Sequence, residues 1–285
     1  MAFEKIALII DSCTDVIPEY VKKFKMYSLP VTVNYKDGSY RDNIDISTEE
    51  VIKRLPHEIP STSLPSPALA GELLDKVIAD GFKKAVVVTI SSGLSGTYNT
   101  VRMMLDRVPQ LEYELIDTKN IGLGAGFTAM RAAELIEQGT PFAQLRSLLE
   151  QSVLKTKVFF SVTTLKYLHA GGRIGEVTYR MGSLLDASPV ISCNEKGVYY
   201  TARMARGRTK ALKKAVDLAQ KVAEGFAKYN VAVVHAGALD ESEKILARVG
   251  ELFPHAQNVF KGQISSALVV HTGPGLVGIG VQGLS

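Results

Sequence analysis

One segment, in which a strand-like run leads directly into a glycine- and serine-rich turn and then a helix, constrains the fold of this chain most strongly. The run Ala85–Ile90 favours a strand, and a helical pattern covers Thr97 to Leu105. Between them lies the turn Ser91-Ser92-Gly93-Leu94-Ser95-Gly96. Units of this kind build parallel sheets covered by helices. Free N–H groups, the helix dipole and the hydroxyls would favour an anion at this turn.

The same turn argues against nucleotide binding, because it lacks the lysine of a phosphate-binding loop and the glycine spacing of a dinucleotide fingerprint. The segment Gly93-Leu94-Ser95-Gly96-Thr97 nearly matches a G-x-S-x-G nucleophile elbow, but its last glycine is missing. A serine esterase or acyl hydrolase that uses Ser95 and His271 is therefore one hypothesis. The simpler interpretation of the turn is a helix cap without a ligand.

Strand and helix signals alternate through the first half of the chain, which predicts a doubly wound α/β fold with a mostly parallel sheet. The expected strands there are 5–10, 27–34, 85–90 and 113–116, and the expected helices are 18–24, 48–53, 67–80, 97–105 and 126–137. The rhythm changes near residues 151–157. The second half favours strands at 158–162, 190–193, 198–203, 231–236, 255–263 and 276–281, with helices at 209–228 and 241–253.

The segment 192–199 contains an Asn/Gly turn between two strand signals, so the second sheet is expected to be mixed or partly antiparallel. We therefore predict two α/β domains, residues 1–155 and 156–285. A chain of 285 residues, of which 46% are hydrophobic, is long enough for two cores. Cys13 and Cys193 lack metal-site or disulfide spacing, and no run approaches the roughly 20 apolar residues of a membrane span. These features predict a soluble cytoplasmic protein without a metal or another cofactor.

Three further polar segments could contribute to a site. Ser61-Thr62-Ser63 offers more hydroxyls than one helix cap requires. Arg173 follows paired glycines, where its guanidinium could grip a carboxylate or phosphate, and His271 precedes a glycine turn. A dense basic segment runs from Arg203 to Lys214. Its default interpretation is a solvated helix face; without interleaved aromatic residues, and with a net charge of only +4, nucleic-acid binding is weakly supported.

Taken together, these motifs resemble the DegV family of bacterial fatty-acid-binding proteins over essentially the whole chain. The resemblance rests on an ordered set of segments: Ile9-Ile10-Asp11-Ser12-Cys13-Thr14-Asp15, Thr62-Ser63-x-Pro65, Ser91 to Thr100, Asp117-Thr118-Lys119, Gly171-Gly172-Arg173-Ile174, Arg206 and His271-Thr272-Gly273-Pro274-Gly275. Cys13 departs from the usual pattern, in which a threonine or serine is expected at this place.

The resemblance implies a non-enzymatic lipid carrier that holds one long-chain fatty acid in a tunnel between the two domains. A partner kinase would use ATP to convert the acid, still bound here, into an acyl phosphate. By motif position, Thr62 and Ser95 would donate to the carboxylate, while Arg173 and His271 complete the polar network. Arg206 would serve partner docking or stabilise the phosphoryl group. The matched motifs add four further ligand-binding residues: Ser63, Ser92, Gly96 and Thr272.

Overall fold

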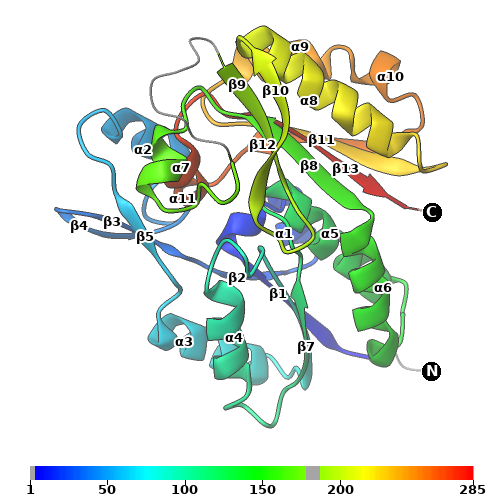
Figure 1. Ribbon diagram of the computed structural model, residues 1–285. Helices are drawn as coiled ribbons and strands as arrows, with labels where there is room; N and C mark the ends of the chain where they lie inside the picture. The colour runs from blue at the N-terminus through cyan, green and yellow to red at the C-terminus, as the bar shows by residue number, and fades with distance from the viewer. Residues whose placement is uncertain (1–3, 178–186, 285) are drawn as a thin grey trace.

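The computed structural model describes residues 4–177 and 187–284, which form two large sheets and one small one (Figure 1). The first sheet is parallel, as the sequence predicted, and its strand order is β2-β1-β6-β7. The strands of this sheet are β1 (Ile6–Asp11), β2 (Tyr27–Leu29), β6 (Lys84–Thr89) and β7 (Glu112–Asp117). The two central strands, β1 and β6, are mainly apolar and buried along nearly their whole length because helices cover both faces.

Two groups of helices cover the parallel sheet, which confirms the doubly wound pattern. One face packs against α3 (Pro67–Ala79) and α4 (Thr97–Leu105), through residues such as Leu74 and Val101. The other face packs against α1 (Pro18–Lys23), α5 (Leu123–Glu137) and α6 (Phe142–Leu154). Helix α6 was not predicted from the sequence pattern, and α5 begins at Leu123, three residues before the predicted start at Gly126.

The second sheet is mixed, with strand order β10-β9-β8-β13-β11-β12. All its neighbouring strands pair antiparallel except β11 and β12, and the predicted hairpin between β9 and β10 is confirmed. Its strands are β8 (Thr156–Ser161), β9 (Ala187–Cys193), β10 (Tyr199–Arg206), β11 (Tyr229–His235), β12 (Ala256–Gln263) and β13 (Val277–Gly283). Helix α5 also contacts β8 and β13, so it lies between the two large sheets.

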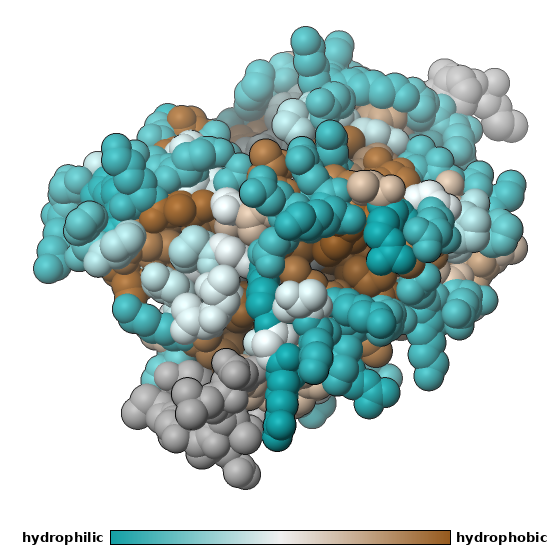
Figure 2. All heavy atoms as spheres, turned by 90° about the horizontal axis from the view of Figure 1, so that it is seen from above, coloured by the Kyte–Doolittle hydropathy of each residue, from teal (hydrophilic) through white to brown (hydrophobic). Residues whose placement is uncertain are grey.

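Three helices pack on the outer face of the mixed sheet: α8 (Arg208–Ala223), α9 (Leu239–Leu246) and α10 (Val249–Leu252). The sequence pattern predicted α9 and α10 as one helix, but Ala247 and Arg248 interrupt it. A groove of about 470 Å³ separates α8 from α9 and α10. Figure 2, which looks down on this side, shows hydrophobic residues in hollows between hydrophilic ridges. None of the helices in the described ranges is long and apolar enough to cross a bilayer.

A small antiparallel sheet, which the sequence analysis missed, lies beside the two large ones. The segment 27–34 was predicted as a single strand, but Pro30, which has no N–H to donate, separates β2 from a strand of this other sheet. The sheet has the order β4-β3-β5, with β3 (Thr32–Tyr35), β4 (Gly38–Arg41) and β5 (Ser61–Ser63). The helix α11 (Ser266–Thr272) packs against β3 and β5, and it also contacts α2 (Thr48–Arg54) and α7 (Lys166–Ala170). The 3-10 helix η1 (Ser12–Thr14) contacts β6 and α5.

Packing across these sheets is extensive. Helix α11 comes from the C-terminal half of the chain but contacts α2, β3 and β5 of the N-terminal half. Its residues share one apolar core with Val33 and Phe160, which belong to different sheets. The mixed sheet begins with β8 at Thr156, and the domain boundary at residue 155 stays a prediction.

Candidate functional site

A cavity of about 500 Å³ opens where the carboxyl ends of β1 and β6 approach β5, α7 and α11. Its polar wall consists of Thr62, Ser63, Ser66, Ser95, Thr100, Arg173, His271 and Thr272. Its apolar wall includes Cys13, Val31, Ile90, Leu94, Ile121, Tyr199 and Leu268. A mainly apolar cavity with polar groups gathered in its wall is the usual form of a small-molecule site.

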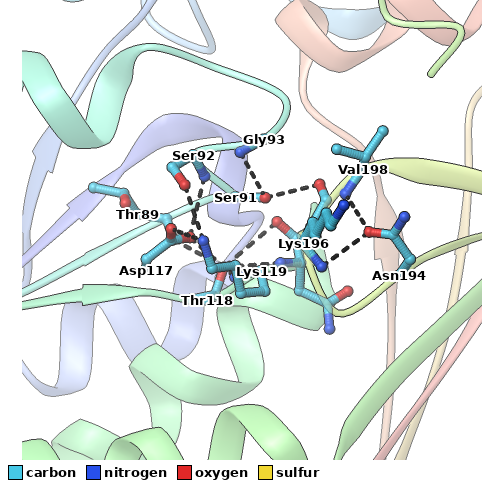
Figure 3. A network of polar contacts seen from close by, with 12 residues as sticks. Thr89, Ser91, Ser92, Gly93, Asp117, Thr118, Lys119, Asn194, Lys196 and Val198 are labelled. Atoms are coloured by element: carbon cyan, nitrogen blue, oxygen red, sulfur yellow. Dashed lines mark hydrogen bonds and ion pairs between the residues drawn. The ribbon is translucent and has the colours of Figure 1, made fainter.

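Two segments far apart in the sequence fix the turn after β6 (Figure 3). The Ser91 hydroxyl donates to the carbonyl oxygen of Gly197, in the turn between β9 and β10, at 2.8 Å, and accepts from the N–H of Gly93. A Cβ atom on Gly197 would lie 1.9 Å from Ser91 Oγ, and its φ is +74°. Only glycine fits so little space and readily adopts this positive φ. The hairpin turn and the Ser/Gly turn are therefore in direct contact.

Asp117, at the end of β7, holds the same turn from its other side (Figure 3). Its carboxylate accepts from the backbone N–H groups of Ser92 and Lys119, each at 3.1 Å. Lys119 Nζ lies 2.6 Å from that carboxylate and also donates to Ser92 Oγ. The N–H and the hydroxyl of Ser92 therefore anchor the turn. Ser92 does not line the cavity.

Ser95 does line the cavity, at the point where the turn enters α4. Its hydroxyl lies 2.8 Å from Thr97 Oγ1 and accepts from the N–H of Thr97. Gly96 is the N-cap of the helix and does not line the cavity; a Cβ there would lie 3.1 Å from Leu64. The predicted strand, turn and helix are therefore confirmed, and they present one of their serines to the cavity.

Thr62 on β5 and His271 on α11 meet in the cavity wall, although 209 positions separate them in the chain. Thr62 Oγ1 lies 2.7 Å from His271 Nε2. The other ring nitrogen, Nδ1, is enclosed and has no hydrogen-bond partner among the described residues. Burial, and secondarily the charge of Arg173, lower the pKa of His271 to about 4, so the imidazole is neutral at pH 7.

Arg173 brings a positive charge to the same wall. Its Nη1 donates to the carbonyl oxygen of Gly171 at 2.7 Å, and its Nε donates to that of Leu94 at 3.3 Å. No carboxylate in the described ranges forms an ion pair with it. Gly171 leaves room for the imidazole, since a Cβ there would lie 2.2 Å from His271 Nδ1. A neutral histidine, hydroxyls and one unpaired guanidinium together suit an anionic group.

Buried Asp42 and half-buried Asp15 position α11, and neither was assigned a role from the sequence. Asp42 accepts from Ser266 Oγ at 2.5 Å and from the N–H of Ala267 at 2.9 Å, while Asp15 accepts from the N–H of Ser265. They satisfy the free N–H groups at the start of the helix that carries His271. Asp15 belongs to the motif Ile9–Asp15 that the sequence analysis noted, but nothing in the sequence linked Asp42 to the start of α11.

A smaller apolar compartment of about 40 Å³ adjoins the main cavity. The two share four wall residues: Ile121, Tyr199, Leu268 and Thr272. The inner compartment lies between the start of α5 and the mixed sheet, and Gly278 and Gly280 of β13 form part of its wall. The apolar space therefore extends from the polar wall toward the interior.

The residues of the esterase hypothesis do not assemble a catalytic triad. The Ser95 hydroxyl pairs with Thr97, and His271 Nε2 faces Thr62 instead of the serine. No acidic group of the described chain holds His271 Nδ1, which a triad requires. In the same described ranges, no group of three or more His, Cys, Asp or Glu side chains is arranged to hold a metal ion.

Arg206 lies outside this cavity, exposed at the end of β10. Its neighbour in the basic segment, Arg208, is used structurally, because it forms an ion pair with Glu241 at 2.9 Å and donates to the carbonyl oxygens of Ser161 and Gly275. Lys214 donates to the carbonyl oxygen of Met204. The segment is therefore not a uniformly solvated basic face.

The neutral state of His271 gives a pH-dependent expectation. A base whose pKa is lowered in the fold contributes stability that is present above its unfolded pKa of about 6.5 and is lost as the pH falls through about 4. NMR titration of the His271 ring should therefore show a midpoint near 4 in the ligand-free protein. An anionic ligand should raise that midpoint, since it favours the imidazolium. A ring that titrates near 6.5 in both states would contradict this description of the site.

Comparisons with known proteins agree with the fold. A family model described as "Uncharacterised protein, DegV family" matches residues 5–283. A DegV domain-containing protein of Clostridium acetobutylicum is 39% identical over 277 residues, which cover 97% of this chain and 98% of that protein.

Solved structures show the same similarity. The structure of a fatty-acid-binding DegV family protein from Thermus thermophilus matches with a TM-score of 0.92 at 27% identity, covering 98% of this chain and all of that one. A stearic-acid-binding protein from Eubacterium ventriosum matches with a TM-score of 0.88 at 27% identity, over 98% of both chains.

Proposed function

The chain belongs to the DegV family, and from this premise we propose that it binds one long-chain fatty acid, with the carboxylate at the polar wall and the acyl chain in the apolar space behind it. The observation that carries the proposal is the guanidinium of Arg173, which has no carboxylate partner among the described residues and lies in the same cavity wall as Thr62 and a neutral His271. A buried carboxylate needs such donors to remain charged. Related proteins described as fatty-acid-binding support the same ligand class.

The donors and acceptors available at Thr62 and His271 support a carboxylate at Thr62. If neutral His271 donates its Nε2 hydrogen to Thr62 Oγ1, the threonine hydroxyl hydrogen is free for the ligand. Ser95 contributes a second hydroxyl, and Arg173 contributes charge. The neutral histidine thus orients a donor without adding a second positive charge to the pocket.

The apolar walls would supply most of the affinity. Burial of about 15 methylenes at roughly 0.8 kcal/mol each amounts to ~12 kcal/mol before the cost of immobilising the ligand. The cavity of about 500 Å³ and its inner compartment offer continuous apolar walls for such a chain. In this proposal the tail provides affinity, and the head group fixes the orientation of the ligand.

Denaturing extraction of the purified protein, followed by mass spectrometry, tests the proposal. We expect one fatty acid per chain, and we expect the delipidated protein to take up added fatty acid. A chain that releases no lipid and takes up no fatty acid would refute the function. Hydrolysis of acyl esters with covalent labelling of Ser95 would instead support the esterase hypothesis.

We also propose that the bound acid is presented to a partner kinase, which transfers phosphate from ATP to the carboxylate and leaves an acyl phosphate on this protein. Leu64 lines the cavity and is 40% exposed, which supports a carboxylate end close to solvent. Arg206 remains the predicted docking or phosphoryl-stabilising residue. Hydroxylamine trapping of the acyl phosphate after addition of the cognate kinase and ATP tests this step. If the fatty acid bound to an Arg206→Ala variant is phosphorylated normally, Arg206 has no part in it.

A further inference from the structure

Four residues line both compartments, and we call them the neck: Ile121, Tyr199, Leu268 and Thr272. One polar group of the neck is not used by the proposed carboxylate site. Of the four residues that form this neck, Ile121 and Leu268 are apolar. The Thr272 hydroxyl already donates to the carbonyl oxygen of Leu268 at 3.0 Å. Tyr199 therefore brings the one neck hydroxyl for which the described residues supply no hydrogen bond.

The Tyr199 ring is held firmly. It is the first residue of β10, directly after the turn that Figure 3 shows locked against the Ser/Gly loop. Its carbonyl oxygen accepts from the N–H of Glu176 at 2.7 Å, and its ring packs edge-on against Phe160, with the centroids 5.3 Å apart. The side chain is 4% exposed. Its hydroxyl therefore occupies a fixed depth in the cavity.

The environment of this hydroxyl differs from that of other buried tyrosines. Tyr229 accepts a hydrogen bond from the N–H of His255, whereas the hydroxyl of Tyr35 is enclosed by protein atoms without a partner. The Tyr199 hydroxyl is not among the enclosed atoms of the described chain, so it keeps access to the cavity that its ring lines. Buried tyrosine hydroxyls usually find a hydrogen-bond partner.

We propose that Tyr199 makes this protein selective for fatty acids that carry a hydroxyl group partway along the acyl chain. The inference rests on the proposed fatty-acid function and adds a second polar contact to it. A plain methylene chain would cover the Tyr199 hydroxyl and leave it unsatisfied. A chain hydroxyl at the same depth would restore a hydrogen bond, and the difference corresponds to about tenfold in affinity.

The test compares stearic acid with a series of positional hydroxystearic acids by titration of the delipidated protein. We expect one position of the hydroxyl to bind about tenfold more tightly than stearic acid. Tyr199→Phe should bind stearic acid more tightly than the wild type does and should lose the positional preference. Tyr35→Phe, which removes a buried hydroxyl outside both compartments, is the matched control and should retain the preference.

The outcomes separate this inference from the proposed function. Failure of every acid to bind the wild type would overturn both. Equal binding of stearic and hydroxystearic acids, or a preference that survives Tyr199→Phe, would overturn the inference alone. If the variant does not fold, the positional series in the wild type decides, and a flat series overturns the inference.

Discussion

Arg173→Gln is expected to weaken the binding of a long-chain fatty acid about a hundredfold, which corresponds to ~2.7 kcal/mol. The guanidinium is the one charge in the cavity wall without a carboxylate partner among the described residues, so its removal leaves the ligand carboxylate with neutral donors only. The matching fatty alcohol carries no charge and should bind the variant and the wild type about equally. Titration of both ligands against both proteins measures the difference.

Two controls accompany this variant. Arg107→Gln removes an exposed arginine that does not line the cavity, and it should leave both affinities unchanged. Thermal unfolding of delipidated Arg173→Gln should resemble that of the wild type, because the hydrogen bonds of the Arg173 side chain to the described residues are two, both to carbonyl oxygens. An equal loss of affinity for the acid and the alcohol would show that the arginine shapes the cavity and does not bind the carboxylate.

Asp42→Ala is expected to destabilise the protein by ~3 kcal/mol and to release the bound ligand. The carboxylate accepts from Ser266 Oγ and the Ala267 N–H at the buried start of α11, and loss of both bonds leaves unsatisfied donors there. The same helix carries His271, so its displacement removes part of the polar wall. Urea unfolding and lipid content, measured on the same preparation, test both effects.

Asp42→Asn is the matched variant, because its amide oxygen can still accept from α11 while the charge is removed. Burial raises the pKa of Asp42, so the fold favours its neutral form. That advantage is fully present below the unfolded pKa of about 3.9 and is lost as the pH rises through the folded value. The free energy of unfolding of the asparagine variant, relative to that of the wild type, should therefore increase as the pH rises. A loss as large as that of Asp42→Ala at every pH would contradict this capping role.

Local sequence patterns predicted the elements that depend on neighbouring residues. The apolar run before Ser91, the turn and the helix from Thr97 are found as predicted, since strand burial and helix initiation are local effects. The parallel sheet followed from the alternation of strand and helix signals. The segment 27–34, predicted as one strand, forms two strands, because Pro30 separates two sheets. The local sequence pattern does not show that the two halves of this segment join different sheets.

The site depends on contacts that sequence spacing cannot show. Thr62 and His271 meet because β5 joins a small sheet that packs on α11. Asp42 reaches α11 across a similar separation. Of the three serines in the turn, Ser95 lines the cavity, Ser92 bonds to Asp117 and Lys119, and Ser91 bonds to Gly197, a difference set by the loop conformation.

A crystal structure of the protein with its co-purified lipid would show the position of the ligand. We expect one acyl chain in the cavity, with its carboxylate within hydrogen-bond distance of Thr62, Ser95 and Arg173 and its tail passing Tyr199 toward the inner compartment. A lipid bound in the reverse direction, or a ligand at the groove between α8 and α9 with this cavity unused, would contradict it.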